Sequence, residues 1–307
     1  MVDRLRTSLG GLSLSAIRRY TALAAERKDC IALTIGEPDL PTPAPICEAA
    51  VRALAGGSTH YTANQGSASL RAKLAAYEAK TRQLDYGPDE IIVTAGATEA
   101  IYCALTGVLD PGDEVVIAAP YWVSYSEMVK QAGAVPVIVA ATEEADFKIT
   151  AEQLDAAITD NTKVFMLNSP SNPTGMVYTR AELEAIAEVC CRRNVYVIAD
   201  EIYCNLVYDN NEFVSFASLS EDAKNRTILV NGVSKSYAMT GWRIGYTASN
   251  PALAKVMANY LSHSTSAPST ISQQAAITAL RGPQEDMQAM KQAFEARRNH
   301  LVERMNK

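Results

Sequence analysis

The sequence predicts an α/β protein of three layers (α/β/α), in which helices cover both faces of a mostly parallel central sheet. From about residue 90 onward, short β-rich runs alternate with segments of helical spacing. These β-rich runs are continuously apolar, which is typical of strands that are buried on both faces. Alternation of this kind favours parallel strands joined by right-handed crossovers.

The expected elements follow one another in a regular order. Strands are expected at Ile91–Thr94, Glu114–Ala118, Val135–Ala140, Lys163–Leu167, Val195–Ala199 and Thr227–Val230. Helices are expected over Ala97–Leu109, near Ser124–Ala132, from the N-cap Thr150 through Ile158, and from the N-cap Thr179 to about Arg193. Ligands of such sheets bind at the carboxyl ends of strands, so the loops that follow the strands are the places to search for functional side chains.

Both ends of the chain depart from this alternation. Near the N-terminus, Leu14–Lys28 predicts a helix, Ile31–Ile35 a strand and Pro38–Pro45 an irregular loop, and a long helical pattern runs from Pro283 to the end. We therefore expect three parts: a segment 1–45 that belongs to a small domain or an interface, a large domain 46–282, and the truncated start of a small C-terminal domain, 283–307.

Composition narrows the classes of function. The chain has 307 residues, 48% of them hydrophobic, and a net charge of −6 with scattered basic residues, so we expect no nucleic-acid or membrane partner. No apolar run approaches the roughly 20 residues that span a bilayer, and charged residues interrupt the N-terminus, so a cytoplasmic location is expected. Six cysteines without a C-x-x-C pair predict reduced thiols, and three widely spaced histidines predict no metal site.

Polar residues gather in three loops that each follow an expected strand. These are Asp200-Glu201-Ile202-Tyr203, the S-P-S-N-P-T-G run that ends at Gly175, and the loop that contains Lys235. Taken singly, each has an ordinary explanation: an acid can cap a helix, S-N-P-T-G suits a turn, and a lone lysine is usually a surface charge. The sequence lacks the P-loop, G-x-G-x-x-G, H-E-x-x-H and G-x-S-x-G motifs, which disfavours nucleotide, dinucleotide and serine-hydrolase chemistry.

Taken together, the three loops resemble one family. The run GVSKSYAMTGWRIG (Gly232–Gly245) is similar to the cofactor-attachment signature of class I and II aminotransferases, in the fold-type-I family of pyridoxal-5′-phosphate (PLP) enzymes. S-P-S-N-P-T-G and D-E-x-Y resemble the family's other two signatures, in the same order. The likeness extends from Gly36 to about residue 280, and the aspartate aminotransferase-like subgroup is the most similar. It implies transfer of an amino group between an L-amino acid and a 2-oxo acid by a ping-pong mechanism.

The resemblance assigns the chemistry to a few residues. Lys235 would form the Schiff base with PLP, and its freed amine would shuttle a proton, which requires a lowered pKa. Asp200 would keep the pyridine nitrogen protonated, so that the ring can accept electrons. Tyr203 and Asn172 would donate hydrogen bonds to the ring oxygen O3′.

The same resemblance predicts a phosphate site. Arg243 offers a bidentate fork and Ser234 a hydroxyl. The turn Gly96-Ala97-Thr98 follows an expected strand and opens a helix, and the N–H groups of a helix N-terminus bind anions.

Three more positions match family roles. Trp122 would stack on the cofactor ring and contact substrate, and Gly36 would meet the substrate carboxylate with help from Asn172. Tyr61 corresponds to a tyrosine that reaches the partner's phosphate, which implies a homodimer with shared active sites. A core tryptophan and a surface-loop tyrosine are the ordinary alternatives for Trp122 and Tyr61.

The chain also departs from the family. Relatives continue into a small C-terminal domain with the arginine that binds the substrate α-carboxylate, whereas this sequence ends at Lys307. We therefore expect that arginine beyond residue 307 and do not assign its role to Arg297, Arg298 or Arg304. We expect the chain to be a fragment of a longer product; the alternative is a naturally short, inactive one. At Thr98 some acid-specific relatives carry a lysine, so aspartate, alanine, methionine and aromatic donors all stay open.

Other functions remain possible on this scaffold. A PLP-dependent C–S lyase or a cyclase would share the cofactor residues, and the signatures do not separate them from a transaminase. A truncated and inactive fragment is a further alternative. A ligand-sensing regulator would need a DNA-binding domain before Gly36, which we do not expect.

Overall fold

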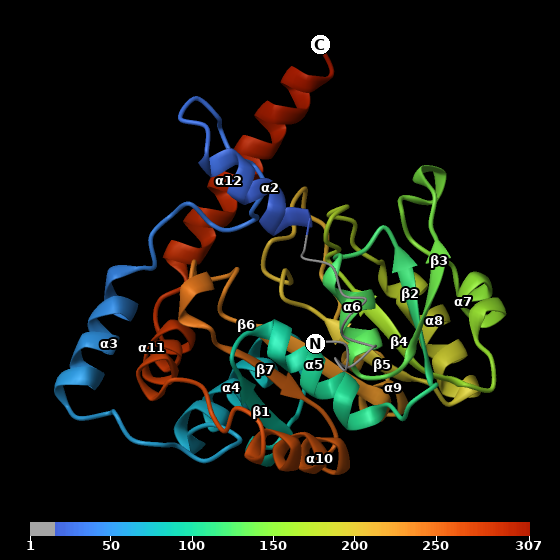
Figure 1. Cartoon of the computed structure of the whole chain (residues 1–307), viewed down its shortest axis with the longest axis horizontal. Coiled ribbons are helices and arrows are strands. Elements are labelled where there is room, and N and C mark those ends of the chain that lie inside the picture. Colours follow the sequence, from blue (N-terminus) through green and yellow to red (C-terminus); the bar gives the residue numbers. More distant parts are fainter. Residues whose placement is uncertain (1–15) are drawn as a thin grey trace, which may run out of the picture.

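The computed structural model describes residues 16–307 and contains a seven-stranded sheet covered by helices (Figure 1). The strands are β1 (Ile91–Thr94), β2 (Glu114–Ala119), β3 (Val135–Ala140), β4 (Thr162–Asn168), β5 (Tyr196–Asp200), β6 (Thr227–Gly232) and β7 (Gly245–Ala248). Their order in the sheet is β1-β7-β6-β5-β4-β2-β3. Only β7 is antiparallel to its neighbours, so the predicted mostly parallel α/β fold is confirmed.

Helices cover both faces of the sheet, while α2 (Ala16–Ala25) and α12 (Glu285–Met305) project away from it (Figure 1). The other helices are α3 (Ala44–Ala55), α4 (Ala68–Arg82), α5 (Ala97–Val108), α6 (Ser124–Gln131), α7 (Ala151–Ala157), α8 (Arg180–Arg193), α9 (Glu221–Arg226), α10 (Pro251–Ser262) and α11 (Thr270–Arg281). Four short 3-10 turns complete the set: Pro88–Glu90, Glu143–Ala145, Phe216–Ser218 and Thr240–Trp242.

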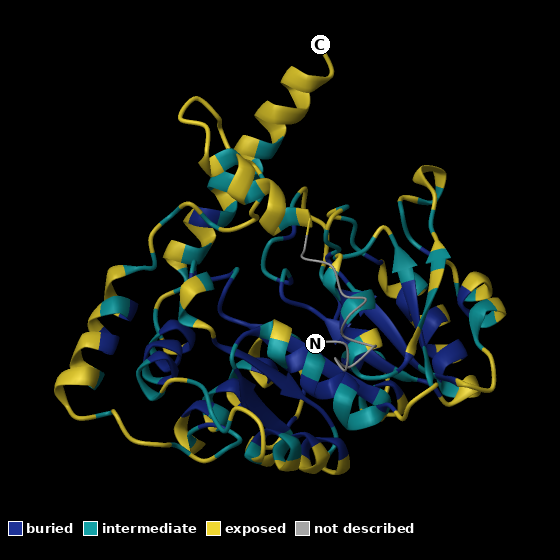
Figure 2. Cartoon of the chain, in the orientation of Figure 1, coloured by how far each residue is buried: buried dark blue, intermediate teal, exposed yellow. Residues whose placement is uncertain are grey.

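Alternate residues of each strand enter different cores, which is why the sheet needs cover on both faces. On β2, Val115 and Ile117 pack under α5, α6 and α10, whereas Val116 packs toward α7 and α8. A third core under α3, α4 and α11 takes Ile91 and Val93 from β1. Figure 2 shows the resulting buried centre, with exposed residues on the outer helices and along α12.

Local sequence explains where several helices begin. The side chains of Thr150 and Thr179 accept hydrogen bonds from the N–H groups of Gln153 and Glu182. The side chains of Gln153 and Glu182 in turn accept bonds from the N–H groups of the two threonines, which completes two capping boxes. Both caps were predicted, and the structure confirms them. The long helix expected after Pro283 is present as α12.

The strand expected at Ile31–Ile35 is wrong. These residues are irregular, and the side chains of Ile31 and Leu33 are 88% and 90% exposed. Alternating apolar residues suit a strand, but a strand also needs a partner, and no described strand pairs with this segment. Of the helix expected over Leu14–Lys28, residues 14 and 15 lie outside the described residues, residues 16–25 form α2, and residues 26–28 follow its end. The proposed domain boundaries stay predictions.

Candidate active site

The carboxyl ends of β4, β5 and β6 bring the three polar loops together. Asn168, the last residue of β4, is paired in register with Asp200, and Asp200 with Val230. Because these neighbouring strands are parallel, the loops after them open at the same edge of the sheet. Asp200 and Lys235, which lie 35 residues apart in sequence, are close enough to influence each other's pKa.

Asp200 is a buried carboxylate with built-in support. Tyr125 donates its hydroxyl to Oδ2 at 2.7 Å, and the N–H of Ile202 donates to Oδ1 at 3.2 Å. Burial raises the pKa of Asp200 to about 6, because the charged form loses water, and these two hydrogen bonds oppose the rise. Asn168 donates from Nδ2 to the backbone carbonyl of Asp200 at 2.9 Å and so fixes the end of the strand.

Lys235 is half-buried and faces the same space. Its Nζ donates to the carbonyl of Gly36 at 2.5 Å and lies 5.7 Å from the centre of the Tyr203 ring. Burial lowers the pKa of Lys235, and nearby Arg243 acts in the same direction, while Glu37 and Asp200 oppose both. A lowered pKa leaves more of the amine neutral and therefore nucleophilic.

Tyr203 and Asn172 form the next part of the edge. Burial raises the pKa of Tyr203 to about 12, the charge of Asp200 adds to the rise, and a hydrogen bond with the Asn172 side chain opposes it. The N–H of Asn172 donates to Oδ1 of Asn168 at 2.7 Å, which holds the S-P-S-N-P-T-G loop against β4. The two residues predicted to act on one ring oxygen are thus side by side.

The phosphate residues also converge. Arg243 has a left-handed backbone (φ 55°) and donates to the carbonyls of Thr240 and Ala95 at 3.0 and 3.2 Å. Gly96, with φ 84°, stands before α5, and a Cβ there would overlap the Arg243 guanidinium. A Cβ on Gly245 would overlap the backbone of Gly96 and Ala97. Glycine is therefore required at both positions to bring the guanidinium against the helix N-terminus.

The remaining predicted residues divide into two groups. Thr98 is exposed in the first turn of α5, Ser234 is buried in the lysine loop, and Trp122 packs edge-on against Tyr125 at 5.3 Å between ring centres. Tyr61, by contrast, is 98% exposed. Gly36 reaches the site through its carbonyl.

Comparison with known proteins identifies the family. The sequence profile described as "Aminotransferase class I and II" matches residues 28–307. This chain belongs to the class I and II aminotransferases. It is accordingly a PLP-dependent aminotransferase of the fold-type-I group.

Individual relatives agree with this aminotransferase assignment. An aspartate aminotransferase of Bacillus sp. (strain YM-2) is 47% identical over 97% of this chain and 76% of its own length. An asparagine–oxo-acid transaminase of Streptococcus mutans is 40% identical over 94% of the chain and 74% of its own. The solved aspartate aminotransferase of Rhizobium meliloti has a TM-score of 0.95 at 41% identity, covering 99% of this chain and 77% of that one.

The residues of this aminotransferase fit the cofactor. Gly96 lets the Arg243 guanidinium lie against the start of α5, and a guanidinium beside a helix N-terminus suits a phosphate dianion. Asp200, buried and supported by Tyr125, suits a ring nitrogen that must stay protonated. Lys235 lies between these two ends, close to the Tyr203 ring.

Sequence reasoning missed two residues of the site. Tyr125 lies inside α6 and contacts Asp200 across 75 residues, and Asn168 supports both Asp200 and Asn172. Asn168 could have been found, because it is the polar residue that ends a buried strand. Tyr125 carried no local signal, since its helical spacing predicts only a core position.

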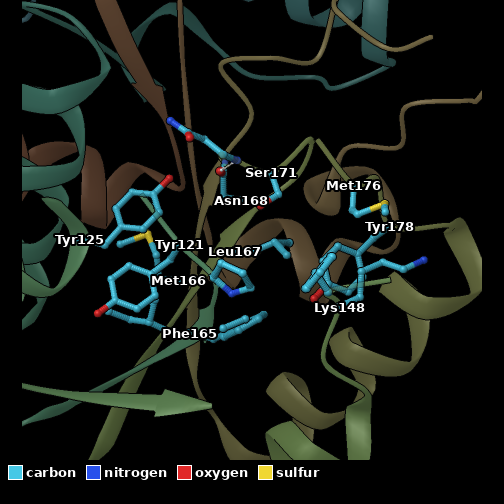
Figure 3. A pocket seen from close by; sticks show the side chains of 15 residues that line it. Tyr121, Tyr125, Lys148, Phe165, Met166, Leu167, Asn168, Ser171, Met176 and Tyr178 are labelled. Atoms are coloured by element: carbon cyan, nitrogen blue, oxygen red, sulfur yellow. Dashed lines mark hydrogen bonds between the residues drawn. The ribbon is translucent and has the colours of Figure 1, made fainter. Parts of the chain in front are cut away.

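A pocket beside the site is lined by residues of the neighbouring strands β2 and β4 and of the loops that follow them (Figure 3). Tyr125 and Asn168 lie at one end of it, and Lys148 and Tyr178 at the other. At one end of the pocket, Lys148 is paired with Glu182 at 2.7 Å. Tyr125 and Asn168 both form hydrogen bonds with Asp200, and they therefore connect this pocket to the site.

No helix in residues 16–307 combines the length and the apolar character needed to cross a bilayer. Over the same range, no group of His, Cys, Asp or Glu side chains has a metal-binding arrangement.

Proposed function

We propose that this aminotransferase attaches PLP at Lys235 and moves the amino group of aspartate to a 2-oxo acid. The observation that carries the proposal is that Asp200 and Lys235 come from loops at the same edge of the sheet, with Nζ of Lys235 5.7 Å from the centre of the Tyr203 ring and Arg243 at the α5 N-terminus. Aspartate is chosen because the relatives at 43–47% identity are named aspartate or aspartate/prephenate aminotransferases. Alanine, methionine and aromatic donors are the alternatives that the assay must compare.

Each residue has a distinct task in this proposal. When bound, PLP supplies an electron-accepting ring. Lys235 would take the proton from the substrate Cα at Nζ and pass it to C4′ of the cofactor within the same half-reaction, helped by its lowered pKa. In the second half-reaction it would move a proton in the opposite direction. Asp200 holds positive charge at the ring nitrogen, and Tyr203 with Asn172 hydrogen-bonds the ring oxygen. Trp122 covers one face of the site and excludes water.

The phosphate and the substrate would be held by other groups. Arg243 and the N–H groups of Gly96, Ala97 and Thr98 bind the phosphate, with the hydroxyl of Ser234. The backbone of Gly36 and the side chain of Asn172 orient the substrate carboxylate.

We further propose a homodimer in which Tyr61 serves the partner's phosphate site. The full exposure of Tyr61, and the exposed Val51 and Leu54 on neighbouring α3, support an interface on this side. Light scattering of the active protein should give the mass of a dimer, and an active monomer would contradict the shared site. The cytoplasmic location stays a prediction, in keeping with six free thiols.

Borohydride reduction of the holoenzyme followed by peptide mapping tests the attachment site. The label should lie on Lys235 and be absent from Lys235→Ala, while Lys224→Ala, a surface-lysine control, should keep it. A label on any other lysine rejects the assignment.

A donor screen tests the reaction with the protein expressed from its complete gene. The absorbance of the cofactor should change fastest with aspartate, and amino groups should appear on the acceptor. Release of pyruvate and ammonia from a sulfur amino acid would instead favour the lyase alternative.

A further inference from the structure

The loops that carry Asp200 and Lys235 leave the sheet where its backbone ladder ends. The last β5–β6 pair in register is Asp200 with Val230, followed by one bond from the N–H of Glu201 to the carbonyl of Val230 at 2.9 Å. Beyond that point, side chains must set the distance between the two loops.

Asn205 is the side chain that joins the two loops. Its Nδ2 donates to Oγ of Ser236 at 2.9 Å and to the hydroxyl of Tyr77 at 3.1 Å. An amide nitrogen has two hydrogens, so both are used. Ser236 directly follows Lys235 and is only 1% exposed, which makes the accepting oxygen inaccessible to bulk water.

The Asn205 loop is itself anchored to α4. Arg82 pairs with Glu78 at 2.8 Å, with side chains 5% and 0% exposed, and also donates to the sulfur of Cys204. Tyr246 on β7 donates its hydroxyl to Glu78. A buried ion pair is weak evidence for stability, because removing its charges from water costs about as much as the attraction returns. Its geometry, however, fixes Cys204 and hence Asn205 relative to α4 and β7.

We propose that Asn205 and Ser236 form a positioning pair that holds the Lys235 loop at a fixed distance from Asp200 and Tyr203. The pair acts through Lys235, so the inference rests on the proposed attachment of PLP there. Ser236 supplies the acceptor, Asn205 the donor, and Tyr77 with the Arg82–Glu78 pair supplies the anchor. Neither Asn205 nor Ser236 touches the reacting atoms.

A double-mutant cycle tests the pair: Ser236→Ala, Asn205→Leu, and both together. The half-reaction with amino donor should slow roughly ten- to hundredfold in each single variant, because small misplacements of a reacting group are costly. The double variant should be no slower than the slower single one, since both remove one interaction. Asn211→Ala, which removes an exposed loop amide bonded to the Tyr208 carbonyl, is the control that should leave the rate unchanged.

Two readouts other than turnover separate positioning from stability. The pH midpoint of the cofactor absorbance, which reports the amine of Lys235, should shift in both single variants and not in Asn211→Ala. The melting temperature of the Ser236→Ala apoprotein should fall by no more than about 4 °C.

Unchanged rates and midpoints in both single variants would overturn the inference. It would also be overturned if the double variant were slowed by the product of the two single effects, because the two side chains would then act independently. Peptide mapping of the wild-type adduct distinguishes the two levels of failure. A label away from Lys235 rejects the proposed function, whereas a label on Lys235 combined with wild-type behaviour of the variants rejects only the positioning pair.

Discussion

Two neighbouring carboxylates at the end of β5, Asp200 and Glu201, share one environment but differ in their partners. Both are buried, and burial raises the pKa of Asp200 to about 6 and of Glu201 to about 8. Asp200 faces the edge of the sheet with Tyr125 and half-buried Lys235. Glu201 faces inward, where Oε1 accepts from the Ser215 hydroxyl at 2.7 Å.

Two acids that are buried to a similar extent can therefore serve different purposes: Asp200 belongs to the active site, whereas Glu201 holds neighbouring elements together. Around Glu201 the neighbours are themselves buried, and Arg82 only partly offsets the loss of water. Around Asp200 the compensating charge is the amine of Lys235, which comes from a loop at the same edge of the sheet, and such a carboxylate suits a cationic ring nitrogen. A buried acid beside a loop amine is therefore suited to bind a cation, whereas one enclosed by buried side chains ties elements together. Four predictions test this contrast.

The largest effect is expected from removing the charge of Asp200. Asp200→Asn should slow transamination by about two to three orders of magnitude, because the ring nitrogen loses its counter-charge in a site where preorganised charge matters most. The matched variant Glu201→Gln, one residue away, should keep the rate within about tenfold. Single-turnover absorbance measurements compare the two. Similar losses of rate in Asp200→Asn and Glu201→Gln would show that the two acids do not differ in function.

The second effect concerns stability at Glu201. Burial raises the pKa of Glu201 to about 8 in the folded protein, above its ordinary value of 4.5, so between these pH values the folded state holds a proton that the unfolded state has lost. The free energy of unfolding should therefore fall by a few kcal/mol as pH rises from about 4.5 to about 8, and then level off. Denaturant unfolding of Glu201→Gln, which mimics the protonated acid, should lose this slope.

A control with the opposite sign is available at Glu182. A hydrogen bond from Lys148 and the bonds of its capping box hold the pKa of Glu182 below its usual value, although burial alone would raise it. Stability from Glu182 is present above its unfolded pKa and is lost as pH falls. A Glu201→Gln protein with the same pH slope as the wild type would contradict the buried, protonated acid.

The third effect is the pH dependence of cofactor affinity. Asp200 must be ionised to hold a protonated ring nitrogen, so PLP affinity should fall as pH drops through about 6, approaching tenfold per pH unit. Equilibrium titration of the apoprotein with PLP measures this. Asp200→Asn should bind weakly at all these pH values, and a wild-type affinity that is flat between pH 7 and 5 would refute the assigned role.

Much of this arrangement was predictable because its signals are local. Continuous apolar runs and their polar ends located six strands and the loops of Asp200, Asn172 and Lys235. Strand β7 was missed, since Gly245–Ala248 is short and its antiparallel place is set by its neighbours. The error at Ile31–Ile35 has the same origin: a strand exists only where a partner pairs with it.

Contacts between distant segments explain the rest. Tyr125 meets Asp200 because α6 packs on the sheet, and Asn205 meets Ser236 because two loops fold back toward each other. Neither pairing is visible in the order of residues. Arg243 was found only through its place in a long signature, while its position against the start of α5 depends on two glycines from separate segments.

The smallest effect is expected from Tyr125→Phe. This change removes the hydroxyl that donates to Oδ2 of Asp200 and that lowers its pKa. A hydrogen bond to a charged group contributes about 1.5–3 kcal/mol, so the pKa of Asp200 should rise by roughly one unit or more. The midpoint for loss of PLP affinity should move from about pH 6 toward neutral pH, with little change at high pH. Tyr102→Phe, whose ring packs on Tyr260, is the matched control, and equal midpoints in the two variants would show that Tyr125 only fills space.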